Sequence, residues 1–389
     1  MRTVLLKPRF KWTRLHSLYN ELIKNPPENY KIETVKEIKK SNITKLRSSK
    51  YRNYLYKTLF YHLGELPYIL SQLTQSSVNY EKYNMIFASQ HVIKTEQPWV
   101  VDLEFANALN GYLTLSLSKH IVSKRLNSKS CKAILPWSNW AENTLRNSLD
   151  CKGFQDKIKV MRYTVTPKKF VTKKKDSTTK ILFVGSANSS NLLSFEFKGL
   201  YETVDAFIDL QKKYDNLELI IRSMVPFEIK EKTKEYSNIK ILDQRLSEIE
   251  LENLYRSADI FPHAGFEVLN LSVLEAMSYG LPVIATSLYS TPELIKNMKN
   301  GLLIDFPNPN LFYSKNGTPN DHSKSFENAM RKLRPYMTDR LKENMKLLIE
   351  DSSLRNKISR EAALTIEKGE FSIENRNKLL KEIFDYATK

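Results

Sequence analysis

The chain has 389 residues, of which 41% are hydrophobic, 11% aromatic and 27% charged. This is enough apolar material for two or three folded domains, and it excludes wholesale disorder. The ten glycines form neither a G-x-G-x-x-G array nor a G-x-x-x-x-G-K-[ST] loop, so neither the common dinucleotide motif nor the Walker phosphate loop occurs. Six histidines and two cysteines lie scattered without metal-ligand spacing, and we expect no metal and no other cofactor.

The net charge of +18 is confined to the first half of the chain. Residues 1–175 hold 32 Lys and Arg against 12 Asp and Glu, whereas residues 176–389 hold 29 against 31. This asymmetry predicts an anionic partner for the first half: an anionic membrane surface, a phosphorylated acceptor or a nucleic acid. The alternative is a lysine-rich surface that only faces water. Nucleic acid is the weakest of the three partners, because the sequence carries no recognised nucleic-acid motif.

Short apolar segments alternate with amphipathic stretches, which predicts parallel sheets covered by helices on both faces. In the first half the expected strands are Thr3–Leu6, Asn84–Ala88, Trp99–Asp102, Ala133–Leu135 and Ile158–Met161. The segment Tyr54–Leu73 is expected to be a helix broken near Gly64–Pro67. In the second half the expected strands are Ile181–Val184, Leu217–Ile221, Ile239–Leu242, Ile260–Phe261, Val283–Ala285 and Leu302–Ile304. A polar insertion at Pro307–Ser325 and mostly helix are expected after them.

A polar, basic tract at Thr166–Asp176 is typical of a linker between domains. We therefore expect an N-terminal domain over residues 1–170, a C-terminal domain over 177–370, and a last helix over 371–389 that packs back on the N-terminal domain. Both domains are predicted to be doubly wound, with a crevice at the carboxyl ends of their strands. Two cysteines provide no disulfide framework, and no segment is apolar enough to span a membrane, which predicts a cytoplasmic protein.

The segment from Ala258 to Ala285 reads as a strand, a loop, a helix, a tight glycine turn and a second strand. Glu267 lies in the loop before the helix, and Glu275 follows eight residues later within it. A helix N-terminus binds phosphate through its unpaired N–H groups, and Asn270 tolerates the left-handed backbone that turns neighbouring amides towards a ligand. Carboxylates on both sides of an anion site could bind sugar hydroxyls, which describes a nucleotide sugar. Two surface acids on an ordinary helix are the alternative.

Several short motifs surround this carboxylate pair. They are Ile181–Gly185, Lys198-Gly199-Leu200, Ala258-Asp259 with Pro262, residues 275–286, Glu293 and Asn300–Leu303. Together they resemble the donor-binding domain of the retaining GT-B glycosyltransferases of family 4. The resemblance implies two facing Rossmann-like domains with a C-terminal helical crossover. It also implies a metal-independent, retaining enzyme that moves a sugar from a nucleotide-diphosphate sugar to an acceptor. The basic first half then favours a glycan or lipid-linked phosphosugar as the acceptor, at the cytosolic membrane face.

The same resemblance implies roles for the residues of this segment. Glu267 would hold the hydroxyls of the transferred sugar, and Glu275 would hold the ribose of the nucleotide. Lys198 would neutralise the diphosphate, assisted by the backbone amides of Asn270 and Leu271. A fixed cation and a helix dipole at this place stabilise the charge that the leaving diphosphate gains in the transition state.

Three departures from the family pattern affect the phosphate contacts. Ser186 stands where the family often has an arginine, and Val268-Leu269-Asn270 replaces the usual Gly-Phe-Gly. Arg222 ends the second strand of this half, where the family usually has glycine, and it could replace the missing arginine or be only structural. Arg245 follows the third strand, where family members contact the base.

The N-terminal half matches the family less well. Arg9 and Lys11 stand where the family has its glycine-rich first loop, and they could meet a phosphorylated acceptor or simply be solvated. The segment Pro98–Phe105, which includes Asp102 as an expected acceptor contact, resembles the strand that ends in a histidine near the reacting sugar. Glu104 takes the place of that histidine and could serve the reaction or cap the next helix. These departures leave open a non-catalytic binding protein that kept the fold.

Overall fold

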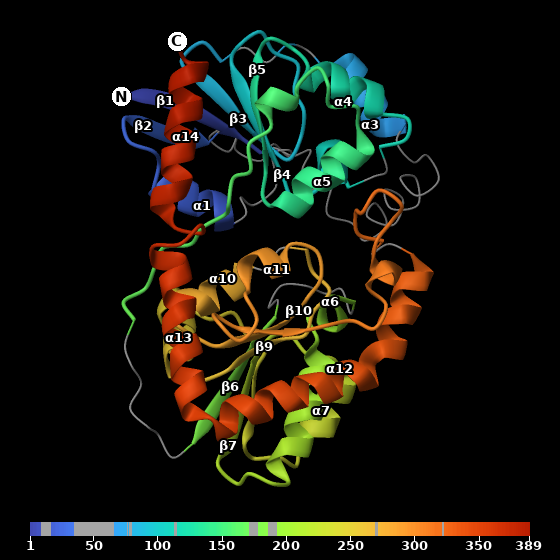
Figure 1. Ribbon diagram of the computed structural model, residues 1–389, viewed down its shortest axis with the longest axis vertical. Helices are drawn as coiled ribbons and strands as arrows, with labels where there is room; N and C mark the ends of the chain where they lie inside the picture. Colours follow the sequence, from blue (N-terminus) through green and yellow to red (C-terminus); the bar gives the residue numbers. More distant parts are fainter. Residues whose placement is uncertain are drawn as a thin grey trace, which may run out of the picture. The chain divides into compact units, whose positions relative to one another are not determined.

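The computed structural model describes residues 1–8, 17–34, 66–75, 77, 80–112, 115–170, 178–185, 193–268, 271–320 and 323–389. They form two compact units, each built on parallel strands with helices beside them (Figure 1). Unit 1 comprises residues 1–163, 315–318 and 374–389. Unit 2 comprises residues 164–314 and 319–373. The chain thus passes from unit 1 to unit 2 after Tyr163, and its last helix belongs to unit 1.

Unit 1 contains a sheet of five strands: β1 Arg2–Lys7, β2 Tyr30–Thr34, β3 Met85–Ser89, β4 Trp99–Leu103 and β5 Cys131–Pro136. Their order is β2-β1-β3-β4-β5, and every pair is parallel. This is a doubly wound order whose direction reverses between β1 and β3. Every residue of β3 and β4 is buried, which explains their unbroken apolar sequence.

The helices of unit 1 are α1 Ser17–Lys24, α3 Leu66–Thr74, α4 Lys119–Leu126, α5 Asn139–Ser148 and α14 Ile373–Ala387, with short 3-10 turns η2 Ala106–Asn110 and η3 Gln155–Lys157. Although α14 comes last in the sequence, it lies beside β1 and β2 (Figure 1). Tyr30 donates a hydrogen bond of 2.8 Å to Asp385, and the Tyr30 and Phe384 rings lie 5.1 Å apart. Arg376 donates to the carbonyl of Asn25 at 2.6 Å. The helix is therefore an integral part of unit 1.

Unit 2 contains six strands: β6 Thr179–Val184, β7 Leu217–Arg222, β8 Ile239–Leu242, β9 Phe261–His263, β10 Val283–Thr286 and β11 Leu302–Ile304. They form two parallel ladders, β6-β7-β8 and β11-β10-β9. A bridge between Ile181 and Ile260 and a 3.0 Å hydrogen bond from the Leu182 amide to the Ile260 carbonyl join β6 to the start of β9. The combined order β8-β7-β6-β9-β10-β11 reverses direction between β6 and β9, which is the dinucleotide-fold order.

The helices of unit 2 are α6 Leu193–Phe197, α7 Leu200–Gln211, α8 Phe227–Thr233, α9 Glu248–Ser257, α10 Leu271–Ser278, α11 Thr291–Leu294, α12 Lys324–Glu350 and α13 Ser352–Glu367, with a 3-10 turn η4 at Pro309–Phe312. The long helix α12 runs alongside α7, and α13 packs against α10 (Figure 1). Among the helices that the structure describes, none has both the length and the apolar character needed to cross a bilayer.

Ten of the eleven predicted strands are confirmed, with ends shifted by up to two residues. The prediction for Ile158–Met161 is wrong: this segment makes one bridge, to Ile134 of β5, and then runs on as irregular chain. β2 was not predicted, because only Tyr30 and Ile32 of its five residues are buried and its pattern is that of an edge. Of the helix predicted at 54–73, residues 54–65 lie outside the described ranges, and α3 begins at Leu66.

Candidate active site

Lys198 and Glu267 meet where the strand order of unit 2 reverses. Lys198 lies in the turn between α6 and α7, downstream of β6, and Glu267 lies in the loop after β9. Their side chains form an ion pair, with 2.7 Å between Lys198 Nζ and Glu267 Oε2. The side chains are 16% and 29% exposed, so the pair is partly shielded yet accessible. In open α/β sheets, ligands bind outside the carboxyl ends of the strands at such a reversal.

Two glycines let the Lys198 turn approach the Glu267 loop. Gly199 has a φ of +76°, and a Cβ there would lie 2.5 Å from the carbonyl oxygen of Ala264. A Cβ on Gly265 would lie 2.6 Å from the carbonyl oxygen of Phe197. The two segments are joined by a 2.7 Å hydrogen bond from the Phe266 amide to that same carbonyl. Side chains at these glycines would therefore separate the two charged groups.

Replacing Gly199 with alanine is expected to destabilise the protein by about 2–4 kcal/mol, because the new Cβ adds a backbone clash to an unfavourable positive φ. Gly317→Ala is a matched control: Gly317 has a φ of +77°, but the nearest heavy atom to its Cβ position is 3.8 Å away. The control should cost about 1 kcal/mol. Calorimetric unfolding of both variants measures the difference, and equal losses would show that the close approach at Gly199 is unimportant.

Glu275 lies on α10 and is held by a buried tyrosine. Tyr255, from α9, donates a hydrogen bond of 3.2 Å to Glu275 Oε2. The Tyr255 ring stacks on Tyr279 with 5.1 Å between centroids, and burial raises the pKa of its hydroxyl well above the ordinary range. The hydroxyl therefore stays protonated and donates to Glu275. A carboxylate has about four acceptor positions, so Glu275 can accept from a ligand hydroxyl as well as from Tyr255.

Arg222 connects the ends of β7 and β6. Its Nη1 donates to the carbonyl of Gly185 at 3.1 Å, and its Nε has no hydrogen-bond partner among the described residues. Burial lowers the pKa of the guanidinium, while Tyr255 and Glu275 act in the opposite direction. Arg222 thus fixes backbone at the strand ends and lies within electrostatic range of Glu275.

Four further residues were predicted to bind the donor. Arg245 is exposed in the loop after β8, and Leu271 is the half-buried first residue of α10. Ser186 and Asn270 lie outside the described residues. Of the predicted donor site, the structure therefore brings together Lys198 with Glu267, and Arg222 with Glu275.

Residues 178–315, which contain all the described groups of this site, match the family described as glycosyl transferases group 1. The chain carries a glycosyl transferases group 1 domain and is a glycosyltransferase. No curated protein matches the sequence.

Solved structures share the GT-B fold of this glycosyltransferase. Anabaena HepE in complex with UDP-glucose is 15% identical with a TM-score of 0.57, over 99% of this chain and all of that one. A glycosyltransferase from Rickettsia africae is 16% identical with a TM-score of 0.55, over 100% of this chain and 99% of that one. WaaG, a glycosyltransferase involved in lipopolysaccharide biosynthesis, is 14% identical with a TM-score of 0.56, over the whole of both chains. At these identities the likeness establishes the fold alone.

Glu104 follows β4 at the carboxyl edge of the unit 1 sheet. Tyr112 donates a 3.0 Å hydrogen bond to its Oε2. Phe105 occupies the N-cap position of the following 3-10 turn, and the amide of Ala106 in that turn donates to Thr144 Oγ1 at 3.0 Å. The capping role and the catalytic role of Glu104 both remain predictions. Arg9 and Lys11 lie outside the described residues.

Asp102 is buried in unit 1, and its carboxylate accepts hydrogen bonds from three side chains and one backbone amide. Tyr19 Oη, Trp137 Nε1 and Tyr163 Oη donate to its Oδ2, the first two at 2.9 and 3.0 Å. The amide of Gln90 donates to its Oδ1 at 2.9 Å. The side chain is fully enclosed, which does not fit the predicted acceptor contact. Asp102 instead ties together four segments of the core.

Stability should increase on acidification through Asp102. Burial raises the pKa of this carboxyl from 3.8 to about 6, outweighing the four donors. Because the folded state then holds the proton more tightly, the free energy of unfolding rises by about 1 kcal/mol as the pH falls from 7 to 5. All four tryptophans (12, 99, 137 and 140) precede residue 164, so tryptophan fluorescence during urea unfolding reports on unit 1. Asp102→Asn should abolish this rise, and an unchanged rise would contradict the assignment.

Two neighbours of the candidate site were not predicted from the sequence. His263 ends β9 and is buried; burial, and then the positive charge of Lys198, hold its pKa well below the ordinary value. Its imidazole is therefore neutral at pH 7, and it lies within electrostatic range of Lys198. Tyr255 is the other. Neither residue belongs to a motif with a recognisable spacing. The sequence feature that could have pointed to His263 is its position at the end of a predicted strand.

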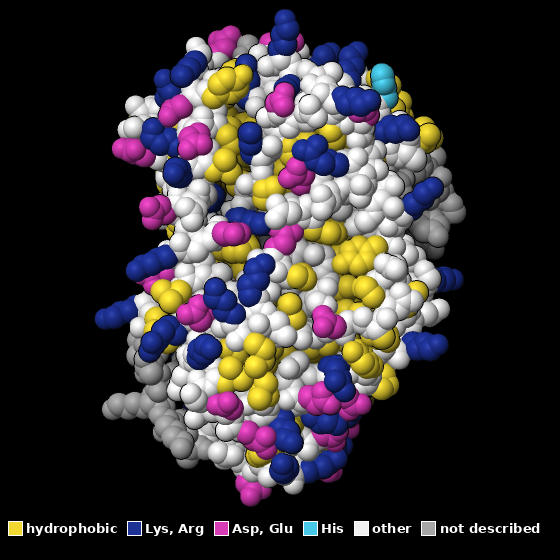
Figure 2. Space-filling view, in the orientation of Figure 1, with side chains coloured by type: hydrophobic (Ala, Val, Ile, Leu, Met, Phe, Trp, Pro, Cys, Tyr) yellow, Lys and Arg dark blue, Asp and Glu magenta, His cyan; other side chains and the backbone are white. Residues whose placement is uncertain are grey.

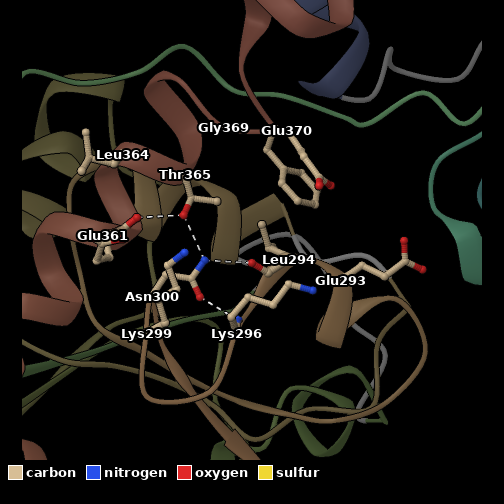
Figure 3. A pocket seen from close by; sticks show the side chains of 11 residues that line it. Glu293, Leu294, Lys296, Lys299, Asn300, Glu361, Leu364, Thr365, Gly369 and Glu370 are labelled. Carbon is tan, nitrogen blue, oxygen red and sulfur yellow. Dashed lines mark hydrogen bonds between the residues drawn. The ribbon is translucent and has the colours of Figure 1, made fainter.

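A pocket of about 260 Å³ lies elsewhere in unit 2, between α13 and the connection from α11 to β11 (Figure 3). Asn300 organises it: its side chain donates to Thr365 Oγ1 at 2.9 Å and to the carbonyl of Leu294 at 3.1 Å, and it accepts from the amide of Lys296 at 2.7 Å. The Asn300-Gly301 motif therefore stabilises a loop. Within the described ranges, no three His, Cys, Asp or Glu side chains gather as they would around a metal ion.

Proposed function

We propose that this glycosyltransferase moves a sugar from a nucleotide-diphosphate sugar to a glycan or lipid-linked phosphosugar acceptor, with retention of anomeric configuration and without a metal ion. The observation that carries the proposal is the Lys198–Glu267 pair at the strand reversal of unit 2, 2.7 Å apart and partly exposed. A cation and a carboxylate side by side match the two parts of such a donor, a diphosphate and a polyhydroxy sugar.

The chemistry follows from how charge moves during transfer. The bond between the anomeric carbon and the diphosphate oxygen breaks, the diphosphate leaves with the electron pair, and the sugar gains oxocarbenium character. The acceptor hydroxyl oxygen then bonds to the anomeric carbon on the face that the diphosphate leaves, and its proton passes to the departing diphosphate. Lys198 donates to the diphosphate as its charge grows, which lowers the barrier because the ammonium is already in place. Glu267 accepts hydrogen bonds from sugar hydroxyls, and Glu275 accepts from the ribose.

A UDP-sugar is the first donor class to test. Two of the solved structures with this fold, Anabaena HepE and the pneumococcal transferase GtfA, hold UDP or a UDP-sugar. In this chain, Arg222 at the end of β7 and Glu275 on α10 lie within electrostatic range of each other. A guanidinium and a carboxylate there supply the donor and the acceptor that a nucleoside requires.

The acceptor is proposed to be anionic or carried on an anionic cytosolic membrane face. The charge excess of the first half supports this. In unit 1, a groove of about 860 Å³ between β5 and α14 is lined by four lysines, at 129, 132, 157 and 159, against two acids, Asp156 and Glu382. On the face in view in Figure 2, Lys and Arg side chains are interspersed with Asp and Glu.

A donor-hydrolysis screen tests the proposal. The purified protein is incubated with UDP-, GDP- and ADP-sugars, and release of the nucleoside diphosphate is followed with and without EDTA. We expect release from one class of donor, unaffected by EDTA, with the α-anomer of an α-linked donor's sugar appearing first in the proton NMR spectrum. An inverted anomer would refute retention, and no release or thermal stabilisation with any donor would favour a non-catalytic binding protein.

A further inference from the structure

The first turns of α12 lie beneath both loops of the donor site. Phe197 precedes Lys198, and Phe266 precedes Glu267. Both rings contact Phe326 of α12, at centroid distances of 5.5 Å and 6.0 Å. The residues that precede Lys198 and Glu267 therefore both pack against the same ring, that of Phe326.

Two arginines on the same part of α12 contact the helices that flank Lys198. Arg331 makes two hydrogen bonds to Glu196 of α6, at 3.0 and 3.2 Å. Arg334 donates to the same carboxylate at 3.2 Å, and its Nε lies 3.7 Å from Glu202 Oε1 of α7. The Arg334 guanidinium thus reaches one carboxylate on each side of the turn that carries Lys198.

These ion pairs differ from ordinary surface pairs in their burial. The Glu196 side chain is 12% exposed and that of Glu202 only 2%. Burial raises the pKa of Glu202 to about 7, and Glu202 Oε2 has no hydrogen-bond partner among the described residues. A buried carboxylate without its arginine must either take up a proton or move towards water. Glu202 lies in the first turn of α7, three residues after Gly199, so we expect such a movement to shift the adjoining turn that carries Lys198.

We propose that Arg334 is a positioning residue for sugar transfer: by holding Glu196 and Glu202 together, it keeps Lys198 in place to receive the donor diphosphate. The inference rests on the proposed function and deepens it, because it says how α12 sets the position of the phosphate-binding lysine. Arg334 lies 138 positions after Glu196 in the sequence. Arg334 itself does not touch the donor.

A double-mutant cycle with UDP as the probe tests this assignment. UDP dissociation constants are measured by calorimetry for the unmodified protein, Arg334→Met, Lys198→Met and the double variant. Arg334→Met is expected to weaken UDP binding about tenfold when Lys198 is present, and less than twofold when Lys198 is already methionine. This non-additivity is the signature of two residues that act through one contact.

Arg340→Met is the matched control. Arg340 lies on the same helix, pairs with Glu343 at 2.9 Å and stands over the ring of Tyr336, much as Arg334 stands over Tyr201. Its removal should leave UDP affinity unchanged. If Arg334→Met does not fold, Arg334→Lys takes its place in the cycle: it keeps a positive charge, loses the two-sided reach of the guanidinium, and should weaken UDP binding about threefold.

The outcomes separate this inference from the proposed function. Equal losses of affinity in both Lys198 backgrounds, or unchanged affinity in Arg334→Met, would overturn the positioning role while leaving the donor site intact. A protein that binds neither UDP nor another nucleoside diphosphate, with or without Lys198, would overturn the donor site itself and this inference with it.

Discussion

Glu267→Ala is expected to lower kcat about 100- to 1000-fold with little change in KM for the donor. The carboxylate lies in the loop after β9 beside Lys198, and we propose that it binds the transferred sugar. Its hydrogen bonds to the sugar strengthen as positive charge develops at the anomeric carbon, so their loss is felt in the transition state more than in the ground state. Initial rates of transfer or donor hydrolysis over a range of donor concentrations separate kcat from KM.

Glu275→Ala is the paired control, because it removes a second carboxylate, from the helix that follows the Glu267 loop. Glu275 is held by Tyr255 and is assigned to the nucleotide, which does not react. Its loss should raise the donor KM about tenfold and leave kcat nearly unchanged. Turnover like that of the unmodified enzyme in both variants would show that the active site lies elsewhere.

Lys198→Met is expected to weaken UDP binding about 10- to 100-fold, the usual cost of losing a hydrogen bond between charged groups. It should also lower kcat, because the leaving diphosphate loses its cation when its charge is greatest. Calorimetric titration with UDP measures the first effect, and single-turnover kinetics measures the second.

Lys234→Met shows whether the loss of any ion-paired lysine has the same effect. Lys234 pairs with Glu231 at 2.8 Å on the surface of α8, and both side chains are about half exposed. Such pairs contribute little to stability, so the variant should bind UDP as the unmodified protein does. If Lys198→Met also binds UDP normally, the diphosphate is held by other groups.

The sequence predicted the buried part of the fold well because buried parallel strands are unbroken apolar runs. β3 and β4 are enclosed on both faces and were found almost to the residue. Edge segments were harder. β2 has only two buried residues and was missed, whereas Ile158–Met161 is apolar because it packs beside β5 and was wrongly predicted as a strand.

For the candidate site, the sequence revealed residues that lie within one short segment or one motif. Glu267 and Glu275 share a loop and a helix, and Lys198 stands in a recognisable motif. Tyr255 and Arg334 contribute through contacts that only the folded chain creates, from separate helices, and no spacing rule relates them to the residues they hold. Asp102 shows the opposite error: a carboxylate at a strand end looked like a ligand contact, yet its hydrogen bonds are satisfied by core side chains.

The membership of α14 in unit 1 sets an order of assembly during translation. All of unit 2 emerges from the ribosome before residues 374–389 do, so it can complete its sheet while the earlier-made half still lacks the helix that covers Tyr30. The half synthesised first is thus finished last. Until then the Arg2 and Tyr30 side chains that α14 contacts lack these partners.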